Sequence, residues 1–327
     1  HGATPWLRLP SRRPRRLVLS KPPPMRVRAV LASQLFVEKA GLSSPVLNAL
    51  KRTAAFQNPE FYKKQAMRLS TALTPRVISC AEDLPQHVAL PRGCVEDVRV
   101  LLRGVPSDLE IRDEREEGRV LDVAFRGELT EPQSRAVQAL VSHDAGIFVA
   151  PAGAGKTVVA TNLIARRARN TLILVHRTQL VEQWIACLAM FLGIEAKRIG
   201  QIGGGRRKPN GDLDVAMIQS LVRKGQVDDL VATYGHIVVD ECHHIPAVSF
   251  ERVMREAKAR FITGLTATPH RRDGHHPILR FQLGPVRFTI DPRMDPGKLP
   301  FSHRLLVRET SFRSEGLQDL GIQEIYR

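Results

Sequence analysis

The sequence predicts an α/β protein whose main domain is a mostly parallel sheet covered by helices on both faces. Five short apolar segments have the length and composition of buried strands. They span 147–150, 171–175, 214–218, 237–240 and 261–265. Helical patterns separate them, the clearest of which is an apolar stripe over 178–192. Polar or glycine-rich segments follow these strands, at the edge where open α/β sheets bind their ligands.

The first 30 residues predict a basic, proline-rich tail. Eight Lys and Arg side chains lie from Arg8 to Arg28, and no Asp or Glu lies among them. A segment of this composition buries too little apolar surface to fold, so we expect disorder. A solvated tail and an electrostatic arm for nucleic acid are both compatible with it. It does not resemble a secretory signal, because no apolar run follows the basic residues.

Residues 31–71 predict a helical segment, and residues 72–127 predict a small α/β domain. An N-cap Asn, a first-turn Pro and an acid at 58–60 begin the clearest helix. Burial of one face of this helix is the favoured interpretation. Base stacking or phosphate binding by its aromatic and basic residues is the alternative. The small domain is inferred from strand-like pieces around a helical piece near 95–102, and we assign it no residue-level role.

The main domain, at 128–290, contains the glycine-rich segment APAGAGKT between a strand and a helix. That context predicts a phosphate-binding loop, although Ala150 replaces the first glycine of the usual pattern. Glycines let the backbone turn its N–H groups onto phosphate oxygens, beside the positive end of the next helix. Lys156 would pair with the β and γ phosphates of ATP, and the Thr157 hydroxyl would bind Mg²⁺. The predicted nucleotide contacts of the loop are Ala152, Gly153, Ala154, Gly155, Lys156 and Thr157.

An Asp-Glu pair ends the apolar strand HIVVDE. Asp240 is placed to hold Mg²⁺, and Glu241 to orient and deprotonate the water that attacks the γ-phosphate. Alone, the pair would be an ordinary polar strand end. Together with the upstream loop it predicts nucleotide hydrolysis with Glu241 as the catalytic base.

Three segments together resemble motifs I, II and III of the superfamily 2 helicases of the DExH type. They are APAGAGKT, DECH at 240–243 and GLTATP at 264–269. The stretch over 234–274 is especially similar to the repair and transcription helicases of the xeroderma pigmentosum group B type and their bacterial relatives. The resemblance implies a RecA-like P-loop lobe and ATP-driven movement on DNA. It also implies that His243, Thr266 and Thr268 link the state of the γ-phosphate to the nucleic-acid-binding surface.

The same resemblance assigns roles to five residues outside these motifs. Gln133, about one helix upstream of the loop, would read adenine through its amide, although a surface glutamine at a helix start is the alternative. His176 and Arg177 resemble part of motif Ia, and Gln219 and Ser220 resemble the next strand-end motif. Both motifs usually contact the phosphate backbone, which suits short polar and basic residues at strand ends.

A second RecA-like lobe is expected to follow this one. Such a lobe supplies arginines to the γ-phosphate in a pattern resembling QxxGRxxR, which this sequence lacks. Residues 291–327 resemble a proline-rich connector and the start of that lobe. The chain also begins with His1, so we expect a fragment of a longer protein. Because arginine fingers contribute about 10³- to 10⁵-fold to related nucleotide hydrolases, we expect the chain alone to be a poor ATPase.

Composition favours a polyanionic partner, because the formal net charge of the 327 residues is +16. No apolar run approaches the length of a membrane span. Four cysteines without paired spacing indicate reduced thiols in a cytosolic compartment and argue against a structural zinc. With the resemblance to bacterial relatives, the expected location is a bacterial cytoplasm or nucleoid. The histidines over 243–276 lie in motif and loop positions without suitable second partners, so we expect no metal bound by them.

The expected function is the N-terminal half of an ATP-dependent DNA helicase or translocase that uses Mg-ATP and acts on single-stranded or forked DNA. The preference for DNA over RNA comes from the resemblance, because phosphate contacts do not distinguish the sugars. One alternative is a nucleotide-gated nucleic-acid-binding or remodelling module without strand separation. Another is the motor subunit of a restriction or defence system, which a nuclease motif in the same protein would favour.

Overall fold

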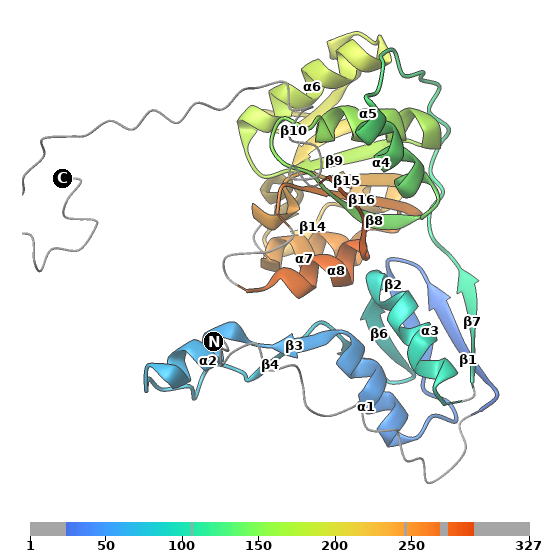
Figure 1. Cartoon of the computed structure of the whole chain (residues 1–327), viewed down its shortest axis with the longest axis vertical. Helices are drawn as coiled ribbons and strands as arrows, with labels where there is room; N and C mark the ends of the chain where they lie inside the picture. The colour runs from blue at the N-terminus through green and yellow to red at the C-terminus, as the bar shows by residue number, and fades with distance from the viewer. Residues whose placement is uncertain (1–23, 106, 245–246, 269–273, 291–327) are drawn as a thin grey trace, which may run out of the picture. The chain divides into compact units, whose positions relative to one another are not determined.

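The computed structural model describes residues 24–105, 107–244, 247–268 and 274–290, without the side chains of His244 and Ala247. Two main sheets organise this part of the chain, one of eight strands and one of five (Figure 1). The expected basic tail, up to residue 23, and the expected connector at 291–327 lie outside the described residues. No described helix is long and apolar enough to cross a membrane.

The eight-stranded sheet confirms the predicted mostly parallel architecture. Its strands lie in the order β11 (Arg206–Lys208), β10 (Gly200–Gly203), β12 (Leu213–Met217), β9 (Thr171–Val175), β15 (His236–Val239), β16 (Phe261–Thr266), β8 (Ala145–Val149) and β17 (Val286–Thr289). Every neighbouring pair is parallel except β10 and β11 at one edge. The five predicted strands correspond to β8, β9, β12, β15 and β16, within two residues at each end.

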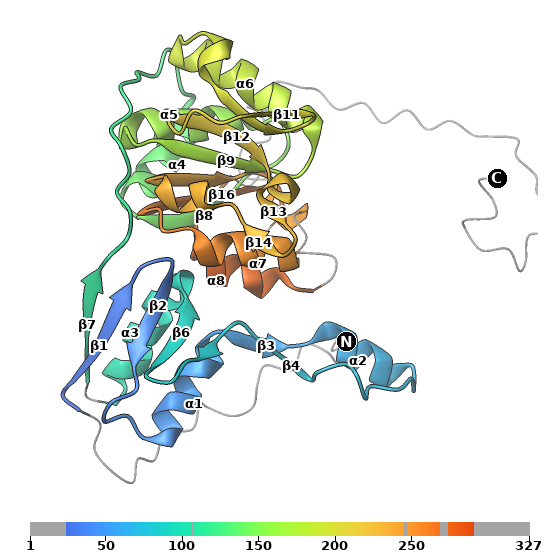
Figure 2. The same ribbon diagram turned by 180° about the vertical axis from the view of Figure 1, so that it is seen from behind.

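Helices cover both faces of this sheet (Figure 2). One face carries α4 (Glu131–Val141), α5 (Lys156–Arg167) and α6 (Thr178–Leu192), and the other carries α7 (Ala247–Glu256) and α8 (His276–Leu283). Strand β8 shows how the sequence produces two cores. Because successive side chains of a strand point to opposite faces, Phe148 packs with the first group of helices, and Ile147 and Val149 pack in the other core.

The N-terminal sheet has the order β5 (Glu82–Asp83), β6 (His87–Pro91), β2 (Gln34–Glu38), β1 (Arg26–Leu31) and β7 (Asp108–Asp113). Helices α1 (Ser44–Thr53) and α3 (Val95–Arg103) contribute buried side chains to its core. The sheet takes strands from all three ranges into which the sequence divided residues 1–127. In β1, Arg26 and Arg28 are exposed while Val27 and Leu31 are buried. This alternation is typical of a strand, and it lies at the end of the segment predicted as a basic tail.

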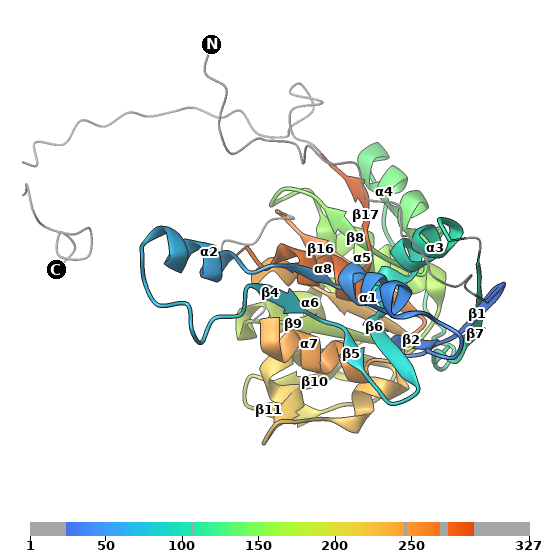
Figure 3. The same ribbon diagram turned by 90° about the horizontal axis from the view of Figure 1, so that it is seen from below.

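Helix α2 (Pro59–Ala66) lies at the end of a two-stranded ribbon, β3 (Ala55–Gln57) and β4 (Val77–Ser79) (Figure 3). Asn58 caps it as predicted, because its side chain accepts the N–H of Glu60. The expected burial of this helix is wrong, since none of its residues is buried. The helix is short and its side chains bind back to the ribbon and the loop between its strands, as the Lys64 to Thr74 hydrogen bond of 2.8 Å shows.

Shorter elements complete the described chain. A second ribbon consists of β13 (Val222–Arg223) and β14 (Gln226–Val227). Single 3₁₀ turns lie at Arg92–Cys94 (η1), Ala196–Arg198 (η2), Ile218–Leu221 (η3), Asp229–Thr233 (η4) and Cys242–His244 (η5). The η1 turn joins the N-terminal sheet closely to α8. A Cβ at Gly93 would lie 2.3 Å from the carbonyl oxygen of Arg280, so this contact requires glycine.

Candidate nucleotide-binding site

The loop between β8 and α5 has a backbone that can receive phosphate oxygens. Gly153 and Gly155 have φ angles of 82° and 80°, in the left-handed region that favours glycine. At Gly155 a Cβ would also lie 2.4 Å from Nε2 of Gln133, so a side chain there would have to displace the end of that glutamine. Because α5 begins at Lys156, the unpaired N–H groups of its first turn are directed towards this loop.

The side chain of Lys156 bridges the loop and the end of strand β15. It is buried, with 8% of the residue exposed. Its ammonium donates to the carbonyl oxygen of Ala150 at 3.2 Å and lies 3.4 Å from Oε1 of Glu241. Phosphate oxygens form stronger charge-assisted hydrogen bonds than a neutral carbonyl does, so a nucleotide can take over these contacts.

Asp240 has both of its carboxylate oxygens fixed by hydrogen bonds. Oδ1 accepts the N–H of Glu241 at 2.8 Å, and Oδ2 accepts the indole N–H of Trp184 at 2.8 Å. Burial raises the pKa of Asp240, and the hydrogen bond from Trp184 opposes that effect. A buried carboxylate of this kind and the hydroxyl of Thr157 are oxygen ligands of the type Mg²⁺ prefers. These residues therefore fit the predicted magnesium site.

The carboxylate of Glu241 lies between the ammonium of Lys156 and the imidazole of His243. Oε1 faces Lys156, and Oε2 lies 3.4 Å from Nδ1 of His243. The backbone of Glu241 has a φ of 44°, which is unusual for a residue with a Cβ. Strained conformations of this kind persist where the surrounding structure imposes them, and they concentrate at functional sites.

Thr266, in β16, continues this line of polar contacts. Its Oγ1 lies 2.7 Å from Nδ1 of His243 and donates to the carbonyl oxygen of Thr268 at 2.6 Å. Because the hydroxyl has one proton, Nδ1 of His243 is the donor in the first of these bonds. The carbonyl of Thr266 also accepts the N–H of Ala150 at 3.0 Å. Lys156, Glu241, His243 and Thr266 thus form what we call the polar chain.

Gln133 contacts the loop as well as the start of its own helix. Its Oε1 accepts the N–H of Thr130 at 3.0 Å, which forms a capping box at the start of α4. Its Nε2 donates to the carbonyl oxygen of Ala154 at 3.1 Å. Gln133 thus caps its helix and also contacts the backbone of the loop, while adenine recognition stays a prediction from the resemblance.

The candidate nucleic-acid residues lie after strands β9 and β12. Gln219 donates to the carbonyl oxygen of His176 at 3.3 Å, which brings the two motifs together. Arg177 is the exposed N-cap residue of α6. Ser220 lies close to the end of β10, because a Cβ added at Gly203 would be 2.9 Å from its Oγ. Thr266 is fully buried, so it can contact only neighbouring protein groups, whereas Thr268 is exposed.

A cavity of about 290 Å³ joins these residues to the polar chain. It is lined by His176, Arg177, Gln179, Leu180, Gln183, Glu241, His243 and Ala267. Its walls come from the predicted nucleic-acid motif after β9, from the Asp-Glu motif and from the segment after β16. A ligand in this cavity would therefore contact both the proposed base and the nucleic-acid candidates.

One contact in the site was not predicted from the sequence. Trp184 belongs to the apolar stripe predicted over 178–192, and its ring is buried in the core, with 1% of the residue exposed. The expectation missed that its N–H donates to Asp240. The only available signal was a nitrogen donor within an otherwise apolar stripe, because a buried indole N–H usually requires an acceptor.

Comparisons with known proteins agree with this geometry. Residues 126–271 match the family described as the res subunit of type III restriction enzymes. The chain is 29% identical over 197 residues to the DNA 3'-5' translocase XPB2 of Sulfurisphaera tokodaii, an alignment that covers 58% of this chain and 44% of that protein. It is 34% identical over 179 residues to the DNA 3'-5' helicase XPB of Kineococcus radiotolerans, covering 53% of this chain and 32% of that protein. The chain thus matches less than half the length of these two relatives.

A solved structure extends the likeness beyond the eight-stranded sheet. The UvsW helicase of bacteriophage T4 aligns with 81% of this chain and with 100% of its own chain, at a TM-score of 0.62 and 18% identity. At that identity the likeness concerns the fold, which is RecA-like over the main domain. The motifs, the family match and the relatives point in one direction. The chain is similar to the superfamily 2 helicases of the xeroderma pigmentosum group B type.

Proposed function

We propose that this chain is the ATP-binding half of a DNA helicase or translocase that couples hydrolysis of Mg-ATP to movement along DNA. The observation that carries the proposal is the polar chain. It runs from the loop lysine through the carboxylate of Glu241 and the imidazole of His243 to Thr266, and its middle members line the cavity beside the nucleic-acid candidates.

The proposed roles follow from these contacts. Lys156 exchanges Ala150 and Glu241 for the β and γ phosphates when ATP binds, which leaves Glu241 free to receive a proton from the attacking water. Asp240 and Thr157 would hold Mg²⁺, which would neutralise charge on the phosphate oxygens. His243 and Thr266 then transmit the change at Glu241 to the segment that ends at Thr268.

The nucleic-acid partner is proposed from three features. The formal net charge is +16, two relatives carry the names DNA translocase and DNA helicase, and His176, Arg177, Gln219 and Ser220 lie together at the strand ends. Contacts of this type bind the phosphate backbone without reading sequence. We propose single-stranded or forked DNA as the substrate, with a second RecA-like lobe completing the site.

A second candidate is the motor of a restriction system, in which translocation serves a nuclease. The matching family, whose description is the res subunit of type III restriction enzymes, favours it. Both candidates use the proposed ATP site, and they differ in whether ATP hydrolysis drives strand separation or translocation alone. Unwinding of a forked duplex supports a helicase, whereas translocation without unwinding supports a restriction or remodelling motor.

The experiment that tests the proposed function is phosphate release from Mg-ATP with and without single-stranded DNA. Lys156→Ala is the blank, because it removes the cation of the loop and keeps the fold of α5. We expect DNA to raise the rate above that of the blank. A rate that is unaffected by DNA and equal to the blank, in a protein that also contains the second lobe, would contradict the proposal.

A further inference from the structure

The indole N–H of Trp184 donates a hydrogen bond to the carboxylate that is proposed to hold Mg²⁺. Trp184 lies in the middle of α6, and its Nε1 donates to Oδ2 of Asp240 at 2.8 Å. Both residues are buried, at 1% and 5% exposure. The hydrogen bond joins two elements that are 56 residues apart in the sequence and is itself buried.

This bond fixes the orientation of the Asp240 carboxylate. Oδ1 already accepts the N–H of Glu241 at 2.8 Å, so each oxygen has one fixed donor. An ionised carboxylate has about four lone-pair positions, and each oxygen therefore keeps one for a cation or its water. Rotation of the carboxylate would break at least one of the two bonds. A ligand that is held in this way does not lose rotational freedom again when the metal binds.

Packing in the core explains why a large ring lies at position 184, but it does not explain why that ring carries an N–H. The other buried members of the α6 stripe are Val181, Leu188 and Leu192, which have no polar atom. An indole nitrogen is a donor only, so burying it without an acceptor is unfavourable. A core position that needed only volume would therefore be filled at lower cost by an aliphatic or phenyl side chain. The N–H is satisfied here by the carboxylate that the proposed chemistry requires.

We propose that Trp184 is a positioning residue that holds Asp240 in the orientation for Mg²⁺ coordination. The inference rests on the proposed function, because it takes Asp240 as the magnesium ligand. Partners of this kind, one step removed from the metal, commonly change metal affinity by about 10- to 100-fold when they are lost.

The test compares wild-type protein with Trp184→Phe, which keeps an aromatic ring and removes the N–H. Binding of a fluorescent ATP analogue is measured by anisotropy over a series of Mg²⁺ concentrations. We expect the Mg²⁺ concentration at half-maximal binding to rise by about tenfold, while binding in the absence of Mg²⁺ stays unchanged. Phe191→Leu, on the same helix, is the matched control and should keep the wild-type midpoint.

A second substitution separates the hydrogen bond from the shape of the ring. The chain has two tryptophans, Trp6 and Trp184. In a Trp6→Phe background, an analogue whose ring sulfur replaces the indole N–H can be incorporated at Trp184 alone. Nearly the same shape is then retained, so this protein should fold even if Trp184→Phe does not, and it should show the same shift in the Mg²⁺ midpoint.

The outcomes distinguish this inference from the proposed function. A wild-type Mg²⁺ midpoint in the sulfur-substituted protein would overturn the positioning role while leaving Mg-ATP binding intact. Wild-type protein whose nucleotide binding does not depend on Mg²⁺ would overturn the proposed function itself, and the positioning role with it.

Discussion

Glu241 is the residue on which the proposed chemistry depends most directly. Its carboxylate lies 3.4 Å from Nζ of Lys156 on one side and 3.4 Å from Nδ1 of His243 on the other, on a backbone with a φ of 44°. This arrangement keeps the carboxylate beside the loop. In the proposed mechanism, phosphates would replace it as partners of Lys156, and the same carboxylate would then take a proton.

Replacing Glu241 with Gln tests this role. The amide keeps the size of the side chain but cannot accept the proton, so we expect hydrolysis to fall by about 10²-fold or more while ATP affinity is kept. Phosphate release and equilibrium ATP binding measure the two quantities. Glu182→Gln, at an exposed position of α6, is the control and should change neither. Normal turnover by Glu241→Gln would show that another group is the base.

The site residues differ in how far the sequence could predict them. The loop and the Asp-Glu pair have strict local spacing, so the sequence located them without knowledge of the fold. The roles of Trp184 and Thr266 depend on contacts across the sheet, and residue spacing does not encode such contacts. Gln133 is intermediate, since its helix-capping pattern is local while its hydrogen bond to Ala154 crosses 21 residues.

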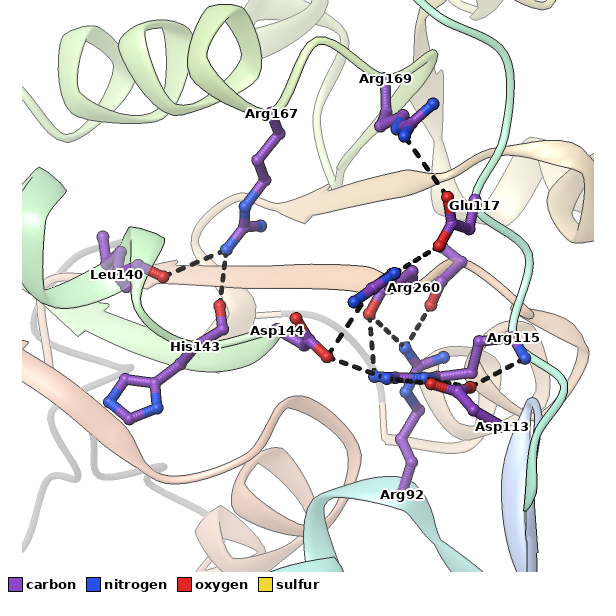
Figure 4. A network of polar contacts seen from close by, with 11 residues as sticks. Arg92, Asp113, Arg115, Glu117, Leu140, His143, Asp144, Arg167, Arg169 and Arg260 are labelled. Atoms are coloured by element: carbon purple, nitrogen blue, oxygen red, sulfur yellow. Dashed lines mark hydrogen bonds and ion pairs between the residues drawn. The ribbon is translucent and has the colours of Figure 1, made fainter. Parts of the chain in front are cut away.

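At the scale of elements, the P-loop helix α5 is anchored at the end that lies away from the loop. Arg167 lies in its last turn and donates to the carbonyl oxygen of His143 at 3.0 Å (Figure 4). The same guanidinium lies 2.9 Å from Nε2 of His236 and stacks over the ring of Phe261 at 4.7 Å. Burial lowers the pKa of Arg167 to about 9, so it stays charged at neutral pH. The helix that carries Lys156 is thereby tied to β15 and β16.

His236 predicts how the stability of this region depends on pH. It is fully buried, and burial, aided by the charge of Arg167, lowers its pKa well below 6.5. The unfolded chain therefore binds a proton near pH 6.5 that the folded chain does not bind. The contribution of neutral His236 to the free energy of unfolding is therefore complete above pH 6.5. It is lost as pH falls below that value, by up to about 1.4 kcal/mol per pH unit.

His236→Gln should flatten this dependence. The variant cannot take up the proton, so its free energy of unfolding should fall less than that of the wild type between pH 7.5 and pH 5. Urea unfolding at a series of pH values measures the difference in slope. The variant loses hydrogen bonds at every pH, so the slope rather than the absolute stability is compared. Equal slopes in the two proteins would contradict a neutral, buried His236.

The elements that the sequence missed share a physical cause. Strands β10, β11 and β17 lie at or near the edges of the sheet and are short, and β11 consists of three exposed basic residues. An edge strand is not buried on both faces, so it lacks the continuous apolar run that revealed the five inner strands. The sequence assigns the strands of the N-terminal sheet to three separate segments, whereas the structure places them in one sheet. Its parallel pair, β1 and β7, is separated by more than 75 residues of sequence.

At the scale of the whole molecule, a buried arginine joins the N-terminal sheet to the main domain. Arg92 is 5% exposed and donates to the carbonyl oxygens of Ala257, Ala259 and Arg260, just before β16. Burial lowers its pKa to about 9. Figure 4 shows further ion pairs around it, in which Arg115 binds Asp113 and Asp144 while Arg260 binds Glu117.

Removing Arg92 should weaken this junction strongly. Arg92→Ala leaves three carbonyl groups without their donor in a buried place, and we expect a loss of about 3 kcal/mol or more in the free energy of unfolding. Urea unfolding measures it, and proteolysis in the segment after β7 reports separation of the two parts. Arg99→Ala, at an exposed position of α3, is the control. An unchanged unfolding midpoint in Arg92→Ala would exclude a structural role for the Arg92 hydrogen bonds.

The central proposal is that the loop at 150–157 binds Mg-ATP, and equilibrium binding of a fluorescent ATP analogue tests it most directly. We expect saturable, Mg²⁺-dependent binding at one site by the wild-type protein. Lys156→Ala should weaken it by about tenfold or more, because a charge-assisted contact to phosphate is lost. Lys197→Ala, at an exposed position, should not change it. Equal affinity in the wild type and in Lys156→Ala, or no saturable binding at all, would contradict the proposal.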